Sequence, residues 1–265
     1  MSAGRVRFLA IGDLMIDVVV AGHGHDAVAR FGPGGTAANA AVWAAALGAE
    51  ATAAGAVGDD PGGRFLRSEL ERRGVEPLLA VDAYAGTGTF VLADGRLHVD
   101  RGANATLSPD GLPTLPDADA VLVSGYLPAE TLDAALAGAR AEWLMLAAAS
   151  LAELPAGANA VVANEREARV LTGAEPEDAV RVLAERHRLA CVTLGARGAL
   201  AVLDGELERA EPEQRALQEV PGAGDAFAAG LLVTLARGGP LAEALAEGCR
   251  CGAAAATVPG WPGRG

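Results

Sequence analysis

The chain contains no lysine, and all 21 of its basic residues are arginine. This absence excludes several enzyme classes. A Walker A loop, a protein kinase and a pyridoxal-phosphate enzyme each need a lysine that contacts phosphate or forms a Schiff base. If the chain handles phosphate, it must therefore use backbone amides, arginine or a metal ion.

Aromatic residues and cysteines are also scarce. Aromatics make up 4% of the chain, which leaves no platform on which the bases of single-stranded nucleic acid could stack. The net charge of −13 opposes broad binding to nucleic acid or anionic membranes. The 3 cysteines give no disulfide framework. Glu50 interrupts the longest Ala-rich segment, and too few residues precede the first apolar run for a signal peptide. We expect a cytoplasmic protein with no nucleic-acid or membrane partner.

Short apolar runs of strand length alternate with helical segments along the chain. Predicted strands include 6–11, 52–57, 121–124, 143–147, 160–163 and 190–194, and predicted helices include 36–47, 64–73, 129–141 and 177–186. This alternation predicts an α/β fold, an αβα sandwich around a mostly parallel sheet. Hairpin-like pieces at about 17–33 and 87–100 predict a small antiparallel β lid outside that sheet. We expect one domain over residues 1–265.

The most informative motif is Pro221-Gly222-Ala223-Gly224-Asp225-Ala226, which opens an apolar helical run. It predicts a glycine turn leading into a helix, whose first backbone N–H groups and dipole favour an anion such as phosphate. Asp225 could then take a proton from a hydroxyl that attacks this phosphate. The alternative is that Asp225 only caps the helix.

A second glycine cluster spans residues 32–39. Gly32, Gly34 and Ala37 satisfy the dinucleotide pattern G-x-G-x-x-A. The cluster follows a lid-like strand rather than the first strand of a βαβ unit, so it does not favour a nicotinamide enzyme. Asn39 fits better as a ligand of sugar hydroxyls, with Gly34 and Gly35 allowing close approach of the backbone.

Several motifs occur together in the order typical of one family. They are Gly12-Asp13 with Asp17, Gly34-Gly35 with Asn39, Gly55 to Asp60, Arg101 to Ala105, Asn164 to Glu167, Thr193 to Gly198, and Gly222 to Asp225. Over about residues 6–257 the chain resembles the ribokinase (PfkB-type) family of carbohydrate kinases. The resemblance implies a ribokinase-like fold, a Rossmann-like αβα core with a β lid.

The resemblance also implies a role for each motif. Asp225 would be the base, and the Gly222-Ala223-Gly224-Asp225 amides would form an anion hole for the γ-phosphoryl group of ATP. The sugar would be held by Asp17, Gly34, Gly35 and Asn39. Asn164, Glu167, Thr193, Gly195 and Gly198 would serve the nucleotide, with Glu167 ordering Mg²⁺ through water.

These roles predict an ATP-dependent kinase that phosphorylates a hydroxyl of a small sugar or sugar-like molecule. A nucleoside kinase of the same family shares every motif, and a non-catalytic sugar- or nucleotide-binding protein on this fold is a further alternative. A homodimer formed through the lid is one expected assembly.

Three positions depart from the family pattern. Glu219 lies in a region that helps to form a monovalent-cation loop in some members of the family. Whether K⁺ activates this chain is therefore left open. Tyr126 stands near the position of a sugar-contacting glutamate in ribokinase. Ala147 ends a strand where a polar Asp or Asn is often found. A weakened or repurposed kinase is therefore an open alternative.

Overall fold

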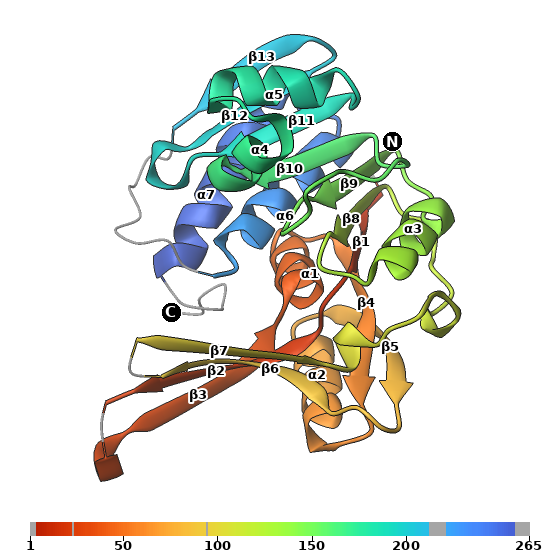
Figure 1. Ribbon diagram of the computed structural model, residues 1–265, viewed down its shortest axis with the longest axis vertical. Coiled ribbons are helices and arrows are strands. Elements are labelled where there is room, and N and C mark those ends of the chain that lie inside the picture. The colour runs from red at the N-terminus through yellow and green to blue at the C-terminus, as the bar shows by residue number, and fades with distance from the viewer. Residues whose placement is uncertain (1–3, 23, 94, 212–220, 258–265) are drawn as a thin grey trace.

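The computed structural model describes residues 4–22, 24–93, 95–211 and 221–257. A nine-stranded sheet has helices on both faces, and a separate four-stranded sheet extends to one side of this body (Figure 1). The predicted αβα sandwich with a small second sheet is confirmed.

The large sheet runs in the order β13-β12-β11-β10-β9-β8-β1-β4-β5. Its strands are β1 (Arg7–Ile11), β4 (Glu50–Gly58), β5 (Val75–Asp82), β8 (Ala120–Ser124), β9 (Trp143–Ala147), β10 (Ala160–Asn164), β11 (Leu189–Thr193), β12 (Ala199–Leu203) and β13 (Glu206–Ala210). Only the β11–β12 and β12–β13 pairs are antiparallel, so the predicted parallel character holds. All the parallel strands therefore end at the same edge.

Two helical layers enclose the sheet. The helices α1 (Thr36–Ala46), α2 (Pro61–Arg72), α6 (Ala223–Ala236) and α7 (Leu241–Thr257) pack on one face, and α3 (Ala129–Gly138), α4 (Glu165–Thr172) and α5 (Pro176–Ala184) pack on the other. Short 3₁₀ turns lie at η1 (Gly24–Asp26), η2 (Ala103–Ala105), η3 (Pro109–Gly111) and η4 (Gly195–Arg197). Within the described ranges, no helix has the length and apolar character needed to cross a membrane.

The helices α1 and α6 lie against each other in the centre of their layer. Both are apolar on nearly all sides, which is typical of buried helices, and most of their residues are buried. Alanine and glycine side chains allow the two helix axes to approach closely. This contact joins residues near 40 to residues near 225.

The second sheet has the order β3-β2-β6-β7, with β2 (Met15–Ala21), β3 (Val28–Gly34), β6 (Thr87–Ala93) and β7 (Arg96–Gly102). The hairpins β2–β3 and β6–β7 are antiparallel, as predicted. The two hairpins join through a parallel pair, β2–β6, which the sequence did not indicate. The strands also extend beyond the predicted segments at 17–33 and 87–100.

Asp60 fixes the base of the second sheet to the core. As the N-cap of α2 it accepts hydrogen bonds from Gly63 N at 2.8 Å and Thr87 Oγ1 at 2.6 Å through Oδ1, and from Thr87 N at 2.7 Å through Oδ2. These donors hold the pKa of Asp60 below its usual value despite the cost of burial. The carboxylate therefore ties the start of α2 to the start of β6.

Candidate active site

A cavity of about 510 Å³ lies where the parallel strands end. Residues at the carboxyl ends of four neighbouring strands line it, namely Ser124 of β8, Ala147 of β9, Asn164 of β10 and Thr193 of β11. Ligands of open α/β sheets bind at this edge. The start of α6, which belongs to the same helical layer as α1, also lines the cavity.

The second sheet covers the cavity with one of its faces. Side chains alternate along a strand, and the register places Asp17 beside Phe90 and Phe90 beside Val99. All three line the cavity, together with Leu97 and Arg101 of β7. The sheet is thus placed as the lid that the sequence predicts.

The first turn of α6 offers backbone donors to the cavity. Gly222 is the N-cap residue, and the bond from Ala226 N to Gly222 O, at 3.0 Å, opens the helical ladder. The amides of Ala223, Gly224 and Asp225 precede that ladder. Gly222, Gly224 and Asp225 line the cavity, whereas Ala223 is not among the lining residues.

The two glycines of this turn have different structural roles. Gly222 has a φ of +89°, a backbone conformation that favours glycine, and a Cβ there would lie 3.1 Å from Asn39 Nδ2. Gly224 is helical, and a Cβ there would meet no described atom within 4 Å. The backbone angles therefore require glycine at 222 only, and position 224 matters for the open space in front of it.

Asp225 is held by a residue far away in the sequence. Its Oδ2 accepts a hydrogen bond from Asn39 Nδ2 at 3.0 Å, across the α1–α6 contact. Burial raises the pKa of Asp225 to about 7, with further upward shifts from Glu167 and Asp13, whereas the Asn39 bond lowers it. Asp225 is the third residue of the helix and Gly222 is its N-cap, so the interpretation of Asp225 as the capping residue is wrong.

Asp17 faces the same cavity from the second sheet. Burial, together with a smaller effect of the negative charge of Asp225, raises the pKa of Asp17 to about 7. A Cβ on Gly34 would lie 1.7 Å from Asp17 Oδ1, so this carboxylate rests directly against the Gly34 backbone. Gly35 has a φ of +85° and passes close to Asp13, where a Cβ would lie 2.3 Å from the Asp13 carbonyl oxygen.

Asn164 and Glu167 form a reciprocal cap at the start of α4. Asn164 Oδ1 accepts from Glu167 N, and Glu167 Oε2 accepts from Asn164 N, both at 2.9 Å. Both residues line the cavity, and burial raises the pKa of Glu167. The sequence grouped these two residues in one motif but did not indicate their mutual bonds.

A magnesium ion fits this arrangement only with water among its ligands. No group of 3 His, Cys, Asp or Glu side chains suited to a metal occurs in the part of the chain that the structure describes. Mg²⁺ usually keeps several waters and binds substrate phosphates with one or two carboxylates. Glu167 and Asp225 face one cavity, and the negative charge of Glu167 adds to the raised pKa of Asp225, which suits such an ion.

The predicted nucleotide turn is only partly at the cavity. Thr193 lines it, whereas Gly195 and Gly198 are not among the lining residues. Both have positive φ, at +57° and +87°, and a Cβ on Gly198 would lie 1.9 Å from the carbonyl oxygen of Ala210. These glycines shape the turn between β11 and β12.

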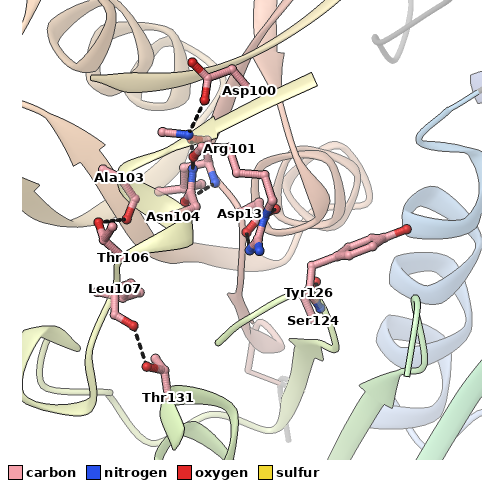
Figure 2. Close-up of polar contacts among 12 residues, drawn as sticks. Asp13, Asp100, Arg101, Ala103, Asn104, Thr106, Leu107, Ser124, Tyr126 and Thr131 are labelled. Atoms are coloured by element: carbon pink, nitrogen blue, oxygen red, sulfur yellow. Dashed lines mark hydrogen bonds and ion pairs between the residues drawn. The ribbon is translucent and has the colours of Figure 1, made fainter. Parts of the chain in front are cut away.

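The sequence missed an ion pair in the cavity wall. Arg101 donates to Asp13 through Nε at 2.9 Å and through its terminal nitrogen at 2.7 Å (Figure 2). Asn104 supports this pair, because its side chain donates to the carbonyl oxygens of Arg101 and Leu14 and accepts from Leu14 N. The sequence identified the 101–105 motif, but no local signal connects it to Asp13.

The three departures from the family pattern lie in different places. Tyr126 and Ala147 both line the cavity. Burial raises the pKa of the Tyr126 phenol, and its backbone N–H donates to Ser124 Oγ at 3.3 Å. Glu219 lies outside the described residues, so the proposed cation loop has no structural account.

The fold and the cavity define a ribokinase-like αβα protein with a β lid. The model of the "pfkB family carbohydrate kinase" matches residues 7–261, and the chain belongs to this family. The protein is therefore a carbohydrate kinase, a phosphotransferase with an alcohol group as acceptor.

Curated relatives and solved structures agree with this assignment. A fructokinase of Klebsiella pneumoniae is 31% identical, covering 96% of this chain and 94% of the relative. An aminoimidazole riboside kinase of Salmonella typhimurium is 33% identical, covering 86% and 83%. The solved aminoimidazole riboside kinase of Salmonella enterica is 26% identical with a TM-score of 0.77, covering 97% and 96%. A fructokinase from Vibrio cholerae, solved with fructose, ADP and potassium, shares the fold at 24% identity, with a TM-score of 0.81 and coverage of 98% and 95%.

The contrast between the two glycines gives the first prediction. Gly224→Val should leave Tm nearly unchanged, because valine is no worse than glycine in a helix and its side chain enters open space. If a phosphoryl group binds at the α6 amides, the variant should lower ATP-dependent turnover by about 100-fold or more, because the valine side chain would displace that group. Gly222→Ala should instead lower Tm by several degrees through backbone strain. Thermal melts and initial rates measure both effects, and normal turnover by Gly224→Val would show that no phosphoryl group lies there.

Proposed function

We propose that this kinase transfers the γ-phosphoryl group of ATP to a hydroxyl of a small sugar or sugar-like molecule, with Asp225 as the general base. One observation carries the proposal. A carboxylate with a raised pKa sits in the first turn of a helix, beside amides that precede the helical ladder, and faces a cavity.

Asp225 has the properties that a base needs at neutral pH. With a pKa of about 7, it is a stronger base than an ordinary aspartate and is still largely ionised just above neutrality. Asn39 fixes the carboxylate through Oδ2, which orients Oδ1 for the acceptor hydroxyl. The hydroxyl proton would pass to Asp225 as the new O–P bond forms and the bond to ADP breaks.

The amides of Ala223, Gly224 and Asp225 would stabilise the transferring group. Negative charge spreads over its three oxygens in a loose transition state, and fixed backbone donors at a helix end suit such charge. The chain has no lysine that could take this role. Mg²⁺, when bound with ATP, would neutralise phosphate charge, and Asn164 and Glu167 would hold it through water.

The acceptor would bind between α1 and the second sheet. Asp17 and Asn39 present a carboxylate and an amide to the cavity, a combination that accepts from and donates to several hydroxyls. Gly34 provides the space in which the Asp17 carboxylate lies. The second sheet would exclude water from the reacting groups.

A nucleoside is the second candidate acceptor. The lid face carries Phe90, Leu97 and Val99 beside Asp17, so an apolar surface adjoins the polar end of the cavity. The relative at 33% identity is named an aminoimidazole riboside kinase. Parallel assays with free sugars and with ribosides distinguish the two acceptor classes.

The second sheet also supports a homodimer. Its exposed apolar side chains include Val28 and Phe31 of β3, each 57% exposed. A second copy packed on this sheet would bury them. Sedimentation at micromolar concentration tests this assembly, and a monomer at all concentrations would contradict it.

Substitution of the base provides the direct test of the mechanism. Asp225→Asn should lower kcat by about 10²–10⁴, because the isosteric amide cannot accept the proton. The fold and ATP binding should be retained. Asp204→Asn, at an exposed turn far from the cavity, is the matched control and should behave as wild type. Near wild-type turnover by Asp225→Asn would rule out Asp225 as the base.

Asp17→Asn should mainly change KM for the acceptor, whereas Asp225→Asn should mainly change kcat. The loss of a charged hydrogen bond to the acceptor costs about 1.5–3 kcal/mol, so KM for the acceptor should rise at least tenfold while KM for ATP changes little. Asn39→Ala should lower kcat as well, since Asn39 also orients Asp225. Steady-state kinetics in both substrates measure this, and equal shifts in both KM values for Asp17→Asn would place Asp17 outside the acceptor site.

A further inference from the structure

Membership of the family does not fix the charge of the acceptor. Relatives of equal similarity include the Klebsiella pneumoniae fructokinase, at 31% identity, and a 1-phosphofructokinase of Haloferax volcanii, also at 31% and covering 83% of this chain. Whether an anionic acceptor fits therefore depends on the charged side chains around the cavity of this chain.

The described lining of the cavity is strongly acidic. It contains the carboxylates Asp13, Asp17, Glu167 and Asp225 and a single basic side chain, Arg101. An acceptor that carries a phosphate or carboxylate would need an accessible cation, and arginine is the usual partner because its fork binds such groups in bidentate fashion. The availability of Arg101 is thus the deciding feature.

Arg101 already has a bidentate partner. Two of its nitrogens donate to the two oxygens of Asp13, and the side chain of Asp13 is only 4% exposed, against 31% for Arg101 (Figure 2). Arg101 thus lines the cavity while the fork of its guanidinium is bound to a buried carboxylate. The positive charge of Arg101 is compensated inside the wall.

Further contacts hold both Asp13 and Arg101 in position. Asp13 follows β1, its carbonyl oxygen accepts from Ala37 N at 3.3 Å, and Gly35 packs against it. The carbonyl oxygen of Arg101 accepts from Asn104, a fully buried residue that also bonds to Leu14 (Figure 2). Breaking the pair to bind an anion would leave the Asp13 carboxylate buried and unpaired, which is costly.

We propose that Asp13, by occupying Arg101, makes the acceptor site selective for uncharged polyhydroxy compounds and against sugar phosphates and sugar acids. This inference rests on the proposed function and narrows its substrate class. The attraction that remains to an anion is small, and the carboxylates of Asp17 and Asp225 repel it at close range. Asp13 is thus a specificity-determining residue that acts through Arg101.

The test compares fructose with fructose 1-phosphate and fructose 6-phosphate as acceptors. These probes share one skeleton and leave opposite terminal hydroxyls free. We measure ATP-dependent kcat/KM for the wild type, Asp13→Asn, and the double variant Asp13→Asn/Arg101→Gln. The wild type should prefer fructose by about 100-fold or more. Asp13→Asn should shift this ratio at least tenfold toward the phosphorylated acceptors, because it frees the charge of Arg101.

The double variant is the matched control. It lacks both charges, so it should lose the gain shown by Asp13→Asn and return to discrimination against both phosphates. Added salt should reduce the gain of Asp13→Asn, since an exposed ionic contact is screened. A pair that only supports the fold would change kcat/KM for all three acceptors by the same factor and leave the ratios unchanged.

The outcomes separate this inference from the proposed function. A wild-type enzyme that prefers a fructose phosphate overturns the inference and leaves the kinase mechanism intact. Unchanged acceptor ratios in Asp13→Asn also overturn it, with the wild-type rates still supporting the mechanism. Absence of phosphoryl transfer to fructose, to ribosides and to sugar phosphates alike contradicts the proposed function itself.

Discussion

The contact between α1 and α6 is the interaction on which the site depends. Small side chains let two buried helices approach, and the hydrogen bond from Asn39 to Asp225 crosses their interface at 3.0 Å. The start of α6 is thereby aimed at the edge where the parallel strands end. The proposed phosphate-binding amides, base and acceptor ligands come together because this one packing arrangement positions them.

Burial raises the pKa values of carboxylates at this site. Asp17 and Asp225 both have a pKa of about 7, in each case mainly because burial disfavours their charged forms. By contrast, Asp13 is compensated by Arg101, and Asp60 by donors from Gly63 and Thr87. Asp13 and Asp60, which hold the structure, are thus compensated by positive charge or by several hydrogen-bond donors. Asp17 and Asp225, which are proposed to bind the acceptor and to act as the base, have raised pKa values.

Features with a local signal were predictable from the sequence. The alternation of apolar runs gave the parallel sheet, and β9 has the predicted bounds of 143–147. The glycine turn before Asp225 gave the start of α6. The edge strands β5 and β13 were missed, since β13 is polar and largely exposed, and Glu76 and Pro77 interrupt β5. The buried strand β12, which lies next to β13, was missed as well.

Features that depend on long-range packing were not predictable. Asp13 lies in the loop after β1 and Arg101 lies on β7 of the second sheet, and only the fold brings them together. The parallel β2–β6 pair likewise joins two hairpins that each looked complete. Gly222 and Gly224 belong to one motif, yet Gly224 is helical and only Gly222 needs the positive φ. Sequence motifs indicated residues that line one cavity, and the contacts between those residues depend on packing.

Asp225 is proposed to be the base, with a pKa raised mainly by burial. A base must be deprotonated to act, so activity should be lost as pH falls through its pKa in the free enzyme. The most direct measurement is kcat/KM for the acceptor between pH 5 and 9 in wild type and Asp17→Asn. We expect a rise that levels off above a pKa of about 7 and that persists in Asp17→Asn. A flat profile, or a rise that disappears in Asp17→Asn, would contradict the claim.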